Sequence, residues 1–194
     1  MNWFSLSRIA PVNTVSHQVT TPTKRLFFAL WPEEEVVKKI KRHALKHFLD
    51  CQGRTLKYSN WHITLAYFGA SDSETQSCLE AKAATIKSTP FELNLSKCGF
   101  WSHPQVAWLA PNDIPDVLKQ LVYDLQQAII PCGFKPDARD YNPHVTIVRK
   151  AKTFPAVTEI KPINMKVTKF CLVESKTFPE GAEYQVLKSW DFSS

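Results

Sequence analysis

The sequence predicts an α+β fold with a loosely duplicated layout, in which two similar lobes share one cleft. Three observations support this prediction. Segments with the two-residue period of strands alternate along the chain with segments that have the 3.6-residue period of helices. The pattern Asn-x-His-apolar-Thr-apolar occurs twice, at residues 60–65 and 142–147. The apolar share of 44% and charged share of 22% are typical of one ordinary folded domain.

The first elements form a strand followed by a helix. The apolar run "RLFFALW" at residues 25–31 is short enough for a buried strand. Pro32 suits the first position of a helix, and three glutamates follow at the positive end of its dipole. The apolar face of this predicted helix consists of Val36, Val37, Ile40, Ala44 and Phe48.

The rest of the chain supplies two more helices and the remaining strands. "SDSE" at 71–74 predicts a capping box that opens a helix reaching about residue 88. "FELNLSKCGFW" and "QVAWLAP" alternate as the two strands of a hairpin, with "SHP" as the turn. A regular 3.6-residue period predicts a helix over 113–130, with Gly133 as its stop. After the second histidine segment, "NMKVTKFCLVES" and "EYQVLKSW" predict two closing strands.

Charge and cysteine content narrow the partners and the compartment. Lys and Arg exceed Asp and Glu by six (24 − 18), which is compatible with a polyanionic partner such as nucleic acid or a phosphorylated ligand, or with a basic protein that has no such partner. Five cysteines without a CxxC pair predict no disulfide framework and a reducing, cytoplasmic location. We expect no membrane span, because no apolar run approaches about 20 residues. Residues 1–24 carry no acidic residue; an extension that is poorly ordered, or a mis-set start, is preferred over a transit peptide.

The repeated pattern combines an imidazole with a hydroxyl. Alternate residues of a strand share a face, so His62 lies beside Thr64 and His144 beside Thr146, with apolar residues on the opposite face. One neutral histidine can accept a proton while a second, protonated histidine donates one. Thr hydroxyls can donate to phosphate oxygens, so the pairs suit metal-free phosphodiester cleavage. The alternative is that both histidines are core residues of ordinary strands.

Two further residues are candidates for substrate binding. Arg149 could neutralise phosphate charge, but it follows His144 by five positions, and this odd offset points it away unless the strand ends or bulges first. A plain surface arginine is the alternative. Tyr141 could stack on a base or simply pack, and Trp61 is more suited to packing.

Several blocks of the chain together resemble a known family. "RLFFALWPEEE", "NWHITLAYFG", "PFELNLSKCGFW", "VAWL" and "YNPHVTIVRK" are similar, in order and spacing, to the RNA 2′,3′-cyclic phosphodiesterases of the two-histidine (2H) phosphoesterase superfamily, historically called 2′-5′ RNA ligases. The likeness covers residues 25–190, and we take 25–194 as the domain. It implies a bilobal fold, a pseudo-twofold pair of antiparallel β-sheets with helices packed on the outside, and an active-site cleft at the centre.

The resemblance also implies the reaction and the site residues. The expected activity is hydrolysis of a 2′,3′-cyclic phosphate on RNA or a nucleotide to a 2′-phosphate, by a monomer, with no cofactor or metal. The match assigns His62 as proton donor, His144 as proton acceptor, and Thr64, Thr146 and Arg149 as phosphate-binding residues. Because the site is nearly symmetric, the opposite division, with His144 as donor and His62 as acceptor, stays open.

Three alternatives remain open from the sequence. A non-catalytic module of the same fold could bind RNA or a nucleotide, although such a module needs no proton-transfer groups. A related 2H enzyme could act on another cyclic phosphate or on a 2′-5′ linkage. A metal-dependent phosphoesterase is disfavoured, because no carboxylate cluster accompanies the histidines. His43 and His47 have a metal-compatible spacing, but without a third ligand we expect a solvated helix face.

Overall fold

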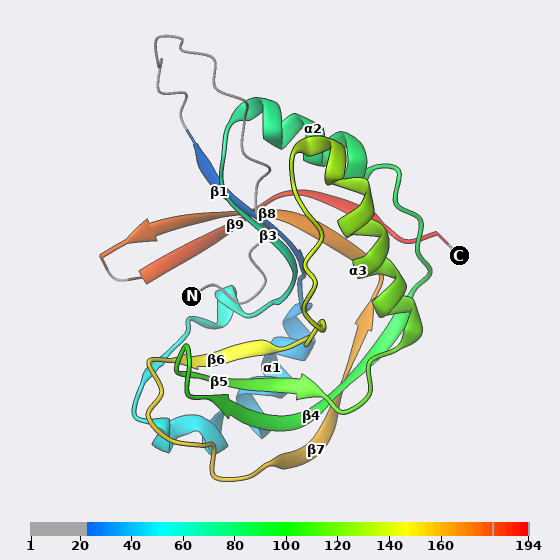
Figure 1. Cartoon of the computed structure of the whole chain (residues 1–194). Helices are drawn as coiled ribbons and strands as arrows, with labels where there is room; N and C mark the ends of the chain where they lie inside the picture. Colours follow the sequence, from blue (N-terminus) through cyan, green and yellow to red (C-terminus); the bar gives the residue numbers. More distant parts are fainter. Residues whose placement is uncertain (1–22, 180, 194) are drawn as a thin grey trace.

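The two predicted lobes are the two halves of one continuous, strongly twisted β-sheet. The computed structural model describes residues 23–179 and 181–193, so most of the predicted 1–24 extension lies outside the described residues. The strand order is β7-β4-β5-β6-β3-β1-β8-β9, with β2 paired to β6 (Figure 1). Every pairing is antiparallel. The strands are β1 Lys24–Leu30, β2 Arg54–Thr55, β3 Ile63–Ser71, β4 Phe91–Trp101, β5 Val106–Pro111, β6 Val145–Arg149, β7 Glu159–Val167, β8 Lys169–Phe178 and β9 Gly181–Asp191.

A single residue pair joins the halves. Ile63 of β3 pairs with Val145 of β6, and on either side of this pair the two halves separate. The units β1-α1-β3 and β5-α3-β6 have the same topology, which gives the expected pseudo-twofold relation. The predicted α+β fold is therefore confirmed.

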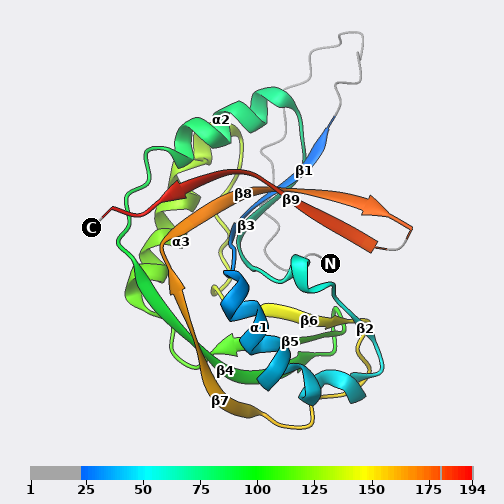
Figure 2. The same ribbon diagram turned by 180° about the vertical axis from the view of Figure 1, so that it is seen from behind.

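The helices cover the outer faces of the two halves. α2 (Ser73–Ala83) and α3 (Asp116–Ala128) pack against each other and against β3, whereas α1 (Glu34–His43) packs against β7 in the other half (Figure 2). Short 3₁₀ helices span Leu45–Cys51, Tyr58–Asn60 and Ile130–Cys132. α1 and α3 thus each cover the half of the sheet that does not contain the strands of their own β-α-β unit.

Strand β1 shows how the sheet separates two apolar layers. Leu26, Phe28 and Leu30 face the helices and belong to the main core. Phe27 and Ala29 face the opposite side, where they form a smaller cluster with residues of β8. The uninterrupted run "RLFFALW" is apolar because β1 is covered on both faces.

The three predicted helices are present, but all of them are shorter than the sequence predicts. The first ends at His43, and a 3₁₀ helix carries Phe48 into the core. The predicted capping box at Ser71 is wrong because Ser71 is the last residue of β3; Asp72 is the N-cap instead and accepts from the Thr75 N–H at 2.8 Å.

The C-terminal strands also differ from the prediction. The stretch "NMKVTKFCLVES" is not one strand, because the ladder is interrupted at Thr168. Before this residue β7 pairs with β4, and after it β8 pairs with β1. The interruption therefore transfers the chain from one half of the sheet to the other.

The expectation of no disulfide is wrong. Cys78 of α2 is bonded to Cys132, which ends the 3₁₀ helix after α3, across 54 residues of sequence. Cys51, Cys98 and Cys171 are buried and free. Counting cysteines did not reveal the pair because its partners meet only when α2 and α3 pack together.

Candidate active site

The two repeated segments meet at the junction between the halves. His62 and His144 are each the residue immediately before a strand, β3 and β6. Because Ile63 pairs with Val145, the antiparallel register places His62 opposite Thr146 and Thr64 opposite His144. The two His-Thr pairs are therefore neighbours, although 82 residues (144 − 62) separate the histidines in sequence.

Both histidines open into one pocket of about 520 Å³ on the face of the sheet opposite the helices. The pocket volume falls within the range of small-molecule sites. The residues that line it come from both halves and include His62, Thr64, Tyr67, His144, Thr146, Arg149, Trp101, Phe27, Tyr184, Arg25, Arg54, Ser175 and Thr177.

The tautomer of each histidine is fixed by a backbone carbonyl two residues earlier. The His62 Nδ1–H donates to the Asn60 carbonyl at 2.7 Å, and the His144 Nδ1–H donates to the Asn142 carbonyl at 2.8 Å. In the neutral ring Nε2 is then the acceptor nitrogen. Nε2 of His62 lies 3.1 Å from Oγ1 of Thr64. In both rings Nε2 is therefore the nitrogen that can accept or donate a proton during a reaction.

Aromatic side chains hold the two imidazoles. The His62 ring stacks on Trp31, with an interplanar angle of 7° and centroids 5.6 Å apart. Phe27 and Tyr184 also contact it, at centroid distances of 4.9 and 5.1 Å. The His144 ring meets Trp101 edge-on at 4.6 Å. These contacts restrict the rotation of both rings.

Burial of the two imidazoles among these side chains lowers the pKa of both histidines to about 4. For His62 the charges of His144 and Arg149 lower the pKa further, while the hydrogen bond to the Asn60 carbonyl opposes the shift. Both rings are consequently neutral near pH 7 in the free protein. An anion bound between them would favour the protonated form and raise these pKa values.

A β-bulge brings Arg149 into the pocket. Thr146 pairs with Trp108 and Val148 with Ala107, so β6 advances two residues while β5 advances one. Ile147 is the extra residue, and it reverses the alternation so that Arg149 shares the face of Thr146. This is the condition under which the odd offset from His144 allows Arg149 to reach the site.

Tyr67 occupies the matching position in the other half. Thr64 pairs with Ala29 and Ala66 with Phe28, so β3 also bulges directly after its threonine. Tyr67 follows His62 by five residues, as Arg149 follows His144, and both line the pocket. Sequence analysis missed Tyr67, although the shared offset of five was a signal that could have revealed it.

Tyr141 and Trp61 do not line the pocket. The Tyr141 hydroxyl donates to the Thr64 carbonyl at 3.1 Å, and its ring packs on the main core. Trp61 is 1% exposed and belongs to that core, as its packing alternative predicted. The structure therefore places Tyr141 behind Thr64, where its hydroxyl supports the strand.

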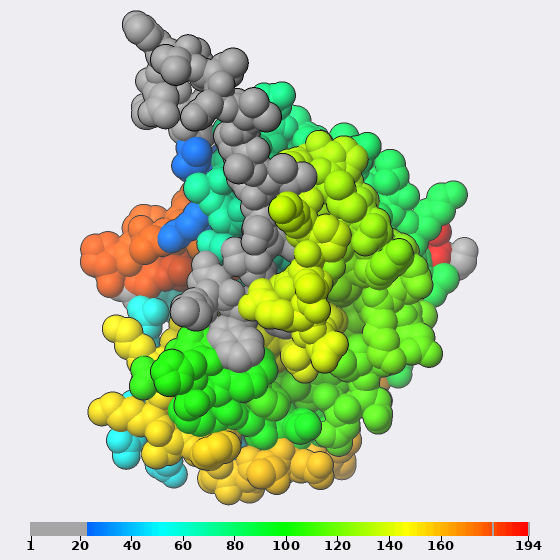
Figure 3. All heavy atoms as spheres, viewed as in Figure 1, coloured from blue at the N-terminus to red at the C-terminus, as the bar shows by residue number. Residues whose placement is uncertain are grey.

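The β8–β9 hairpin forms one wall of the pocket and is tied to the segment before His62. Asn60 is 4% exposed, and its Nδ2 donates to the Ala182 carbonyl at 2.6 Å. Lys57 pairs with Glu183 at 2.8 Å. Figure 3 shows the hairpin projecting from the left side of the molecule. Asn60 therefore connects the position of this wall to the position of His62.

Within residues 23–179 and 181–193, no three His, Cys, Asp or Glu side chains are grouped as a metal site would require. None of the helices in these ranges has the length and apolar character needed to cross a membrane.

The chain is similar to known proteins over most of its length. Residues 29–177 match the family model described as the 2′-5′ RNA ligase superfamily. The RNA 2′,3′-cyclic phosphodiesterases of Escherichia coli (strain K12) and Archaeoglobus fulgidus are 32% and 25% identical over 170 and 178 residues. Each alignment covers 86% of this chain, and 96% and 99% of the relative. The crystal structure of E. coli LigT complexed with 3′-AMP matches with a TM-score of 0.81 at 29% identity, covering 89% of this chain and 99% of LigT. The match to the family model over residues 29–177, together with a relative that is 32% identical over 86% of this chain, identifies the chain as a member of the 2′-5′ RNA ligase superfamily.

Proposed function

We propose that this protein hydrolyses the 2′,3′-cyclic phosphate at RNA or nucleotide ends to a 2′-phosphomonoester by His/His acid–base catalysis without a metal. The observation that carries the proposal is the meeting of two His-Thr pairs in one pocket with Arg149. The names of the relatives in E. coli and A. fulgidus support the substrate class.

The proposed reaction moves one proton at each histidine. Nε2 of His144 takes a proton from water as its oxygen attacks phosphorus, and the bond between phosphorus and O3′ breaks. Nε2–H of His62 donates its proton to the departing O3′, leaving the phosphate on O2′. Proton exchange with solvent then returns both rings to their starting states. Each positioned proton-transfer group typically contributes about 10²- to 10⁴-fold in rate.

The remaining polar groups would bind the phosphate. The hydroxyls of Thr64 and Thr146 lie beside the opposing histidines and can donate to the non-bridging oxygens. The Arg149 guanidinium would balance the charge that develops in the transition state. Binding of the anionic phosphate would also raise the pKa of His62, which must be protonated to act as the acid.

With an RNA 5′-hydroxyl in place of water, the same proton transfers would join it to the cyclic end: its oxygen attacks phosphorus as His144 takes the proton, and the bond between phosphorus and O3′ breaks as His62 protonates O3′, which leaves a 2′-5′ linkage. We propose 2′-5′ ligation by this route, which is the reverse of cleaving a 2′-5′ linkage to a cyclic end and a 5′-hydroxyl, and which is favoured when two RNA ends are held together. The test is incubation of an RNA with a 2′,3′-cyclic end and an RNA with a 5′-hydroxyl end, annealed to a common template. Joined product that is absent with His144→Ala supports ligation, and its absence with the wild-type protein counts against it.

Phosphorus NMR with adenosine 2′,3′-cyclic phosphate, with and without EDTA, tests the main proposal. We expect conversion to the 2′-phosphate at the same rate in EDTA, and loss of turnover in His62→Ala and His144→Ala. His43→Ala is the control, because His43 is exposed at the end of α1 and outside the pocket. Binding without turnover would favour a binding module, and loss of turnover in EDTA would favour a metal enzyme.

A further inference from the structure

The pocket has a second polar end that the proposed reaction does not use. Arg25 on β1 pairs with Ser175 on β8, which in turn pairs with Tyr184 on β9. Paired residues share a face of the sheet, so Arg25 and Ser175 lie on the pocket side, together with Thr177 two residues further along β8. All three line the same pocket as the histidines.

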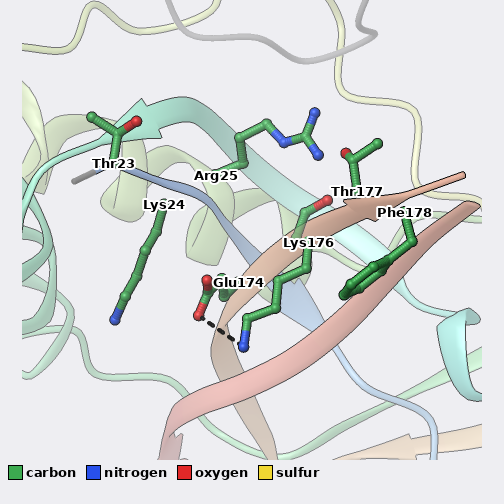
Figure 4. Close-up of a pocket in the computed structure, with 8 residues that line it drawn as sticks. Thr23, Lys24, Arg25, Glu174, Lys176, Thr177 and Phe178 are labelled. Atoms are coloured by element: carbon green, nitrogen blue, oxygen red, sulfur yellow. Dashed lines mark ion pairs between the residues drawn. The ribbon is translucent and has the colours of Figure 1, made fainter.

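The side chain of Arg25 is available to a ligand. Among the residues that the structure describes, no carboxylate or carbonyl group pairs with its guanidinium. Figure 4 shows Arg25 and Thr177 on one side of the strands, whereas Lys24, Glu174 and Lys176 point to the other side. Lys24 is also engaged, because its Nζ donates to Gln76 of α2 at 3.2 Å. Of the two adjacent cations Lys24 and Arg25, Arg25 is therefore the one that faces the pocket.

An aromatic floor lies between the two polar ends. Phe27 contacts Tyr67 and Tyr184 at centroid distances of 6.4 and 5.2 Å, and all three rings line the pocket. Aromatic rings of this kind stack on bases of any identity. Ala29, the partner of Thr64, follows Arg25 by four positions on β1, which corresponds to about 13 Å of strand. The long arginine side chain can span part of this distance.

We propose that Arg25, Ser175 and Thr177 bind the phosphate on the 5′ side of the terminal nucleoside, whose 2′,3′-cyclic phosphate lies between the histidines. This inference rests on the proposed function and names its substrate more closely, as an RNA end and not a free cyclic nucleoside phosphate. A guanidinium with two hydroxyl donors suits a phosphate, and the aromatic floor suits the nucleoside between the two phosphates.

The test compares three substrates: adenosine 2′,3′-cyclic phosphate, the same compound with a 5′-phosphate, and the dinucleotide ApA ending in a 2′,3′-cyclic phosphate. A charge-assisted contact of this type corresponds to about ten- to hundred-fold in kcat/KM. We expect the wild-type protein to prefer the last two compounds by this factor. Arg25→Gln should reduce the preference to a few-fold at most, and Arg25→Lys should retain part of it.

Lys24→Gln is the matched control, since it removes the same charge from the adjacent residue on the opposite face, and it should keep the wild-type preference. Equal kcat/KM for all three substrates, or an unchanged preference in Arg25→Gln, would overturn the inference. A preference for the 5′-monophosphate without one for ApA would show that the subsite binds a terminal phosphate but not the phosphodiester of an RNA chain, which would overturn the assignment of an RNA end as substrate. If no substrate is hydrolysed, the proposed reaction fails, and calorimetry with 5′-AMP and adenosine still tests the subsite: it is absent if both bind equally.

Discussion

Replacing both pocket histidines should remove most of the destabilisation that this protein suffers between pH 7 and pH 5. Burial lowers the pKa of His62 and His144 to about 4 in the folded chain, whereas histidine in an unfolded chain has a pKa near 6.5. Between these two values the unfolded chain binds more protons than the folded one. Each ring therefore reduces stability as the pH falls from about 6.5 towards 4, and has little effect above that range.

The size of the effect follows from the pKa difference of about 2.5 (6.5 − 4). Full titration of one ring would cost about 3 kcal/mol, and at pH 5, where titration is partial, the cost is about 2 kcal/mol relative to pH 7. The two rings together reach about 4 kcal/mol if they act independently. This is a large part of the roughly 5–15 kcal/mol by which domains are stable.

Urea unfolding at pH 7 and pH 5 measures this difference directly. Asparagine is the replacement of choice, because its side-chain amide can still donate to the carbonyls of Asn60 and Asn142. The single variants His62→Asn and His144→Asn should each recover about half of the lost stability, and the double variant most of it. His43→Asn, with its exposed position, should behave as the wild type. An equal loss of stability in the wild type and the double variant would refute the assigned burial of the two rings.

Three further predictions address the bulge, the disulfide and the packing behind His144. Arg149→Gln should lower kcat/KM about ten- to hundred-fold in steady-state assays through loss of a charge-assisted contact; wild-type kinetics would exclude Arg149 from phosphate binding. Reduction of the Cys78–Cys132 disulfide, which closes a loop of 54 residues, should cost about 4 kcal/mol in urea unfolding, and identical oxidised and reduced curves would contradict this. Gly99→Ala should cost about 1–3 kcal/mol in thermal unfolding, because its Cβ would clash with Cζ2 of the Trp108 indole. Adding Trp108→Leu to Gly99→Ala should relieve the clash and restore part of the lost stability. If the double variant is no more stable than Gly99→Ala, the loss does not come from this contact.

The fold class and the pairing of the two histidine segments could be predicted because both depend on local patterns. A two-residue period indicates a strand. The repeated Asn-x-His-apolar-Thr-apolar segment indicates two equivalent strands that carry a histidine and a threonine at the same positions. Helix ends were predicted less well. The spacing of Ser71 to Glu74 fits a capping box and predicts Ser71 as the N-cap, yet pairing with Lys24 keeps Ser71 in the sheet.

The sequence by itself determined the α+β alternation, the two His-Thr pairs and the family resemblance. Only the tertiary structure decided that Arg149 and Tyr67 face the pocket, because their bulges depend on pairing with β5 and β1. The Cys78–Cys132 bond, the transfer of the chain at Thr168 and the position of Arg25 likewise depend on contacts between distant segments. Periodicity records only how a residue relates to its near neighbours in the chain, whereas register and packing between elements are set by the free energy of the whole fold.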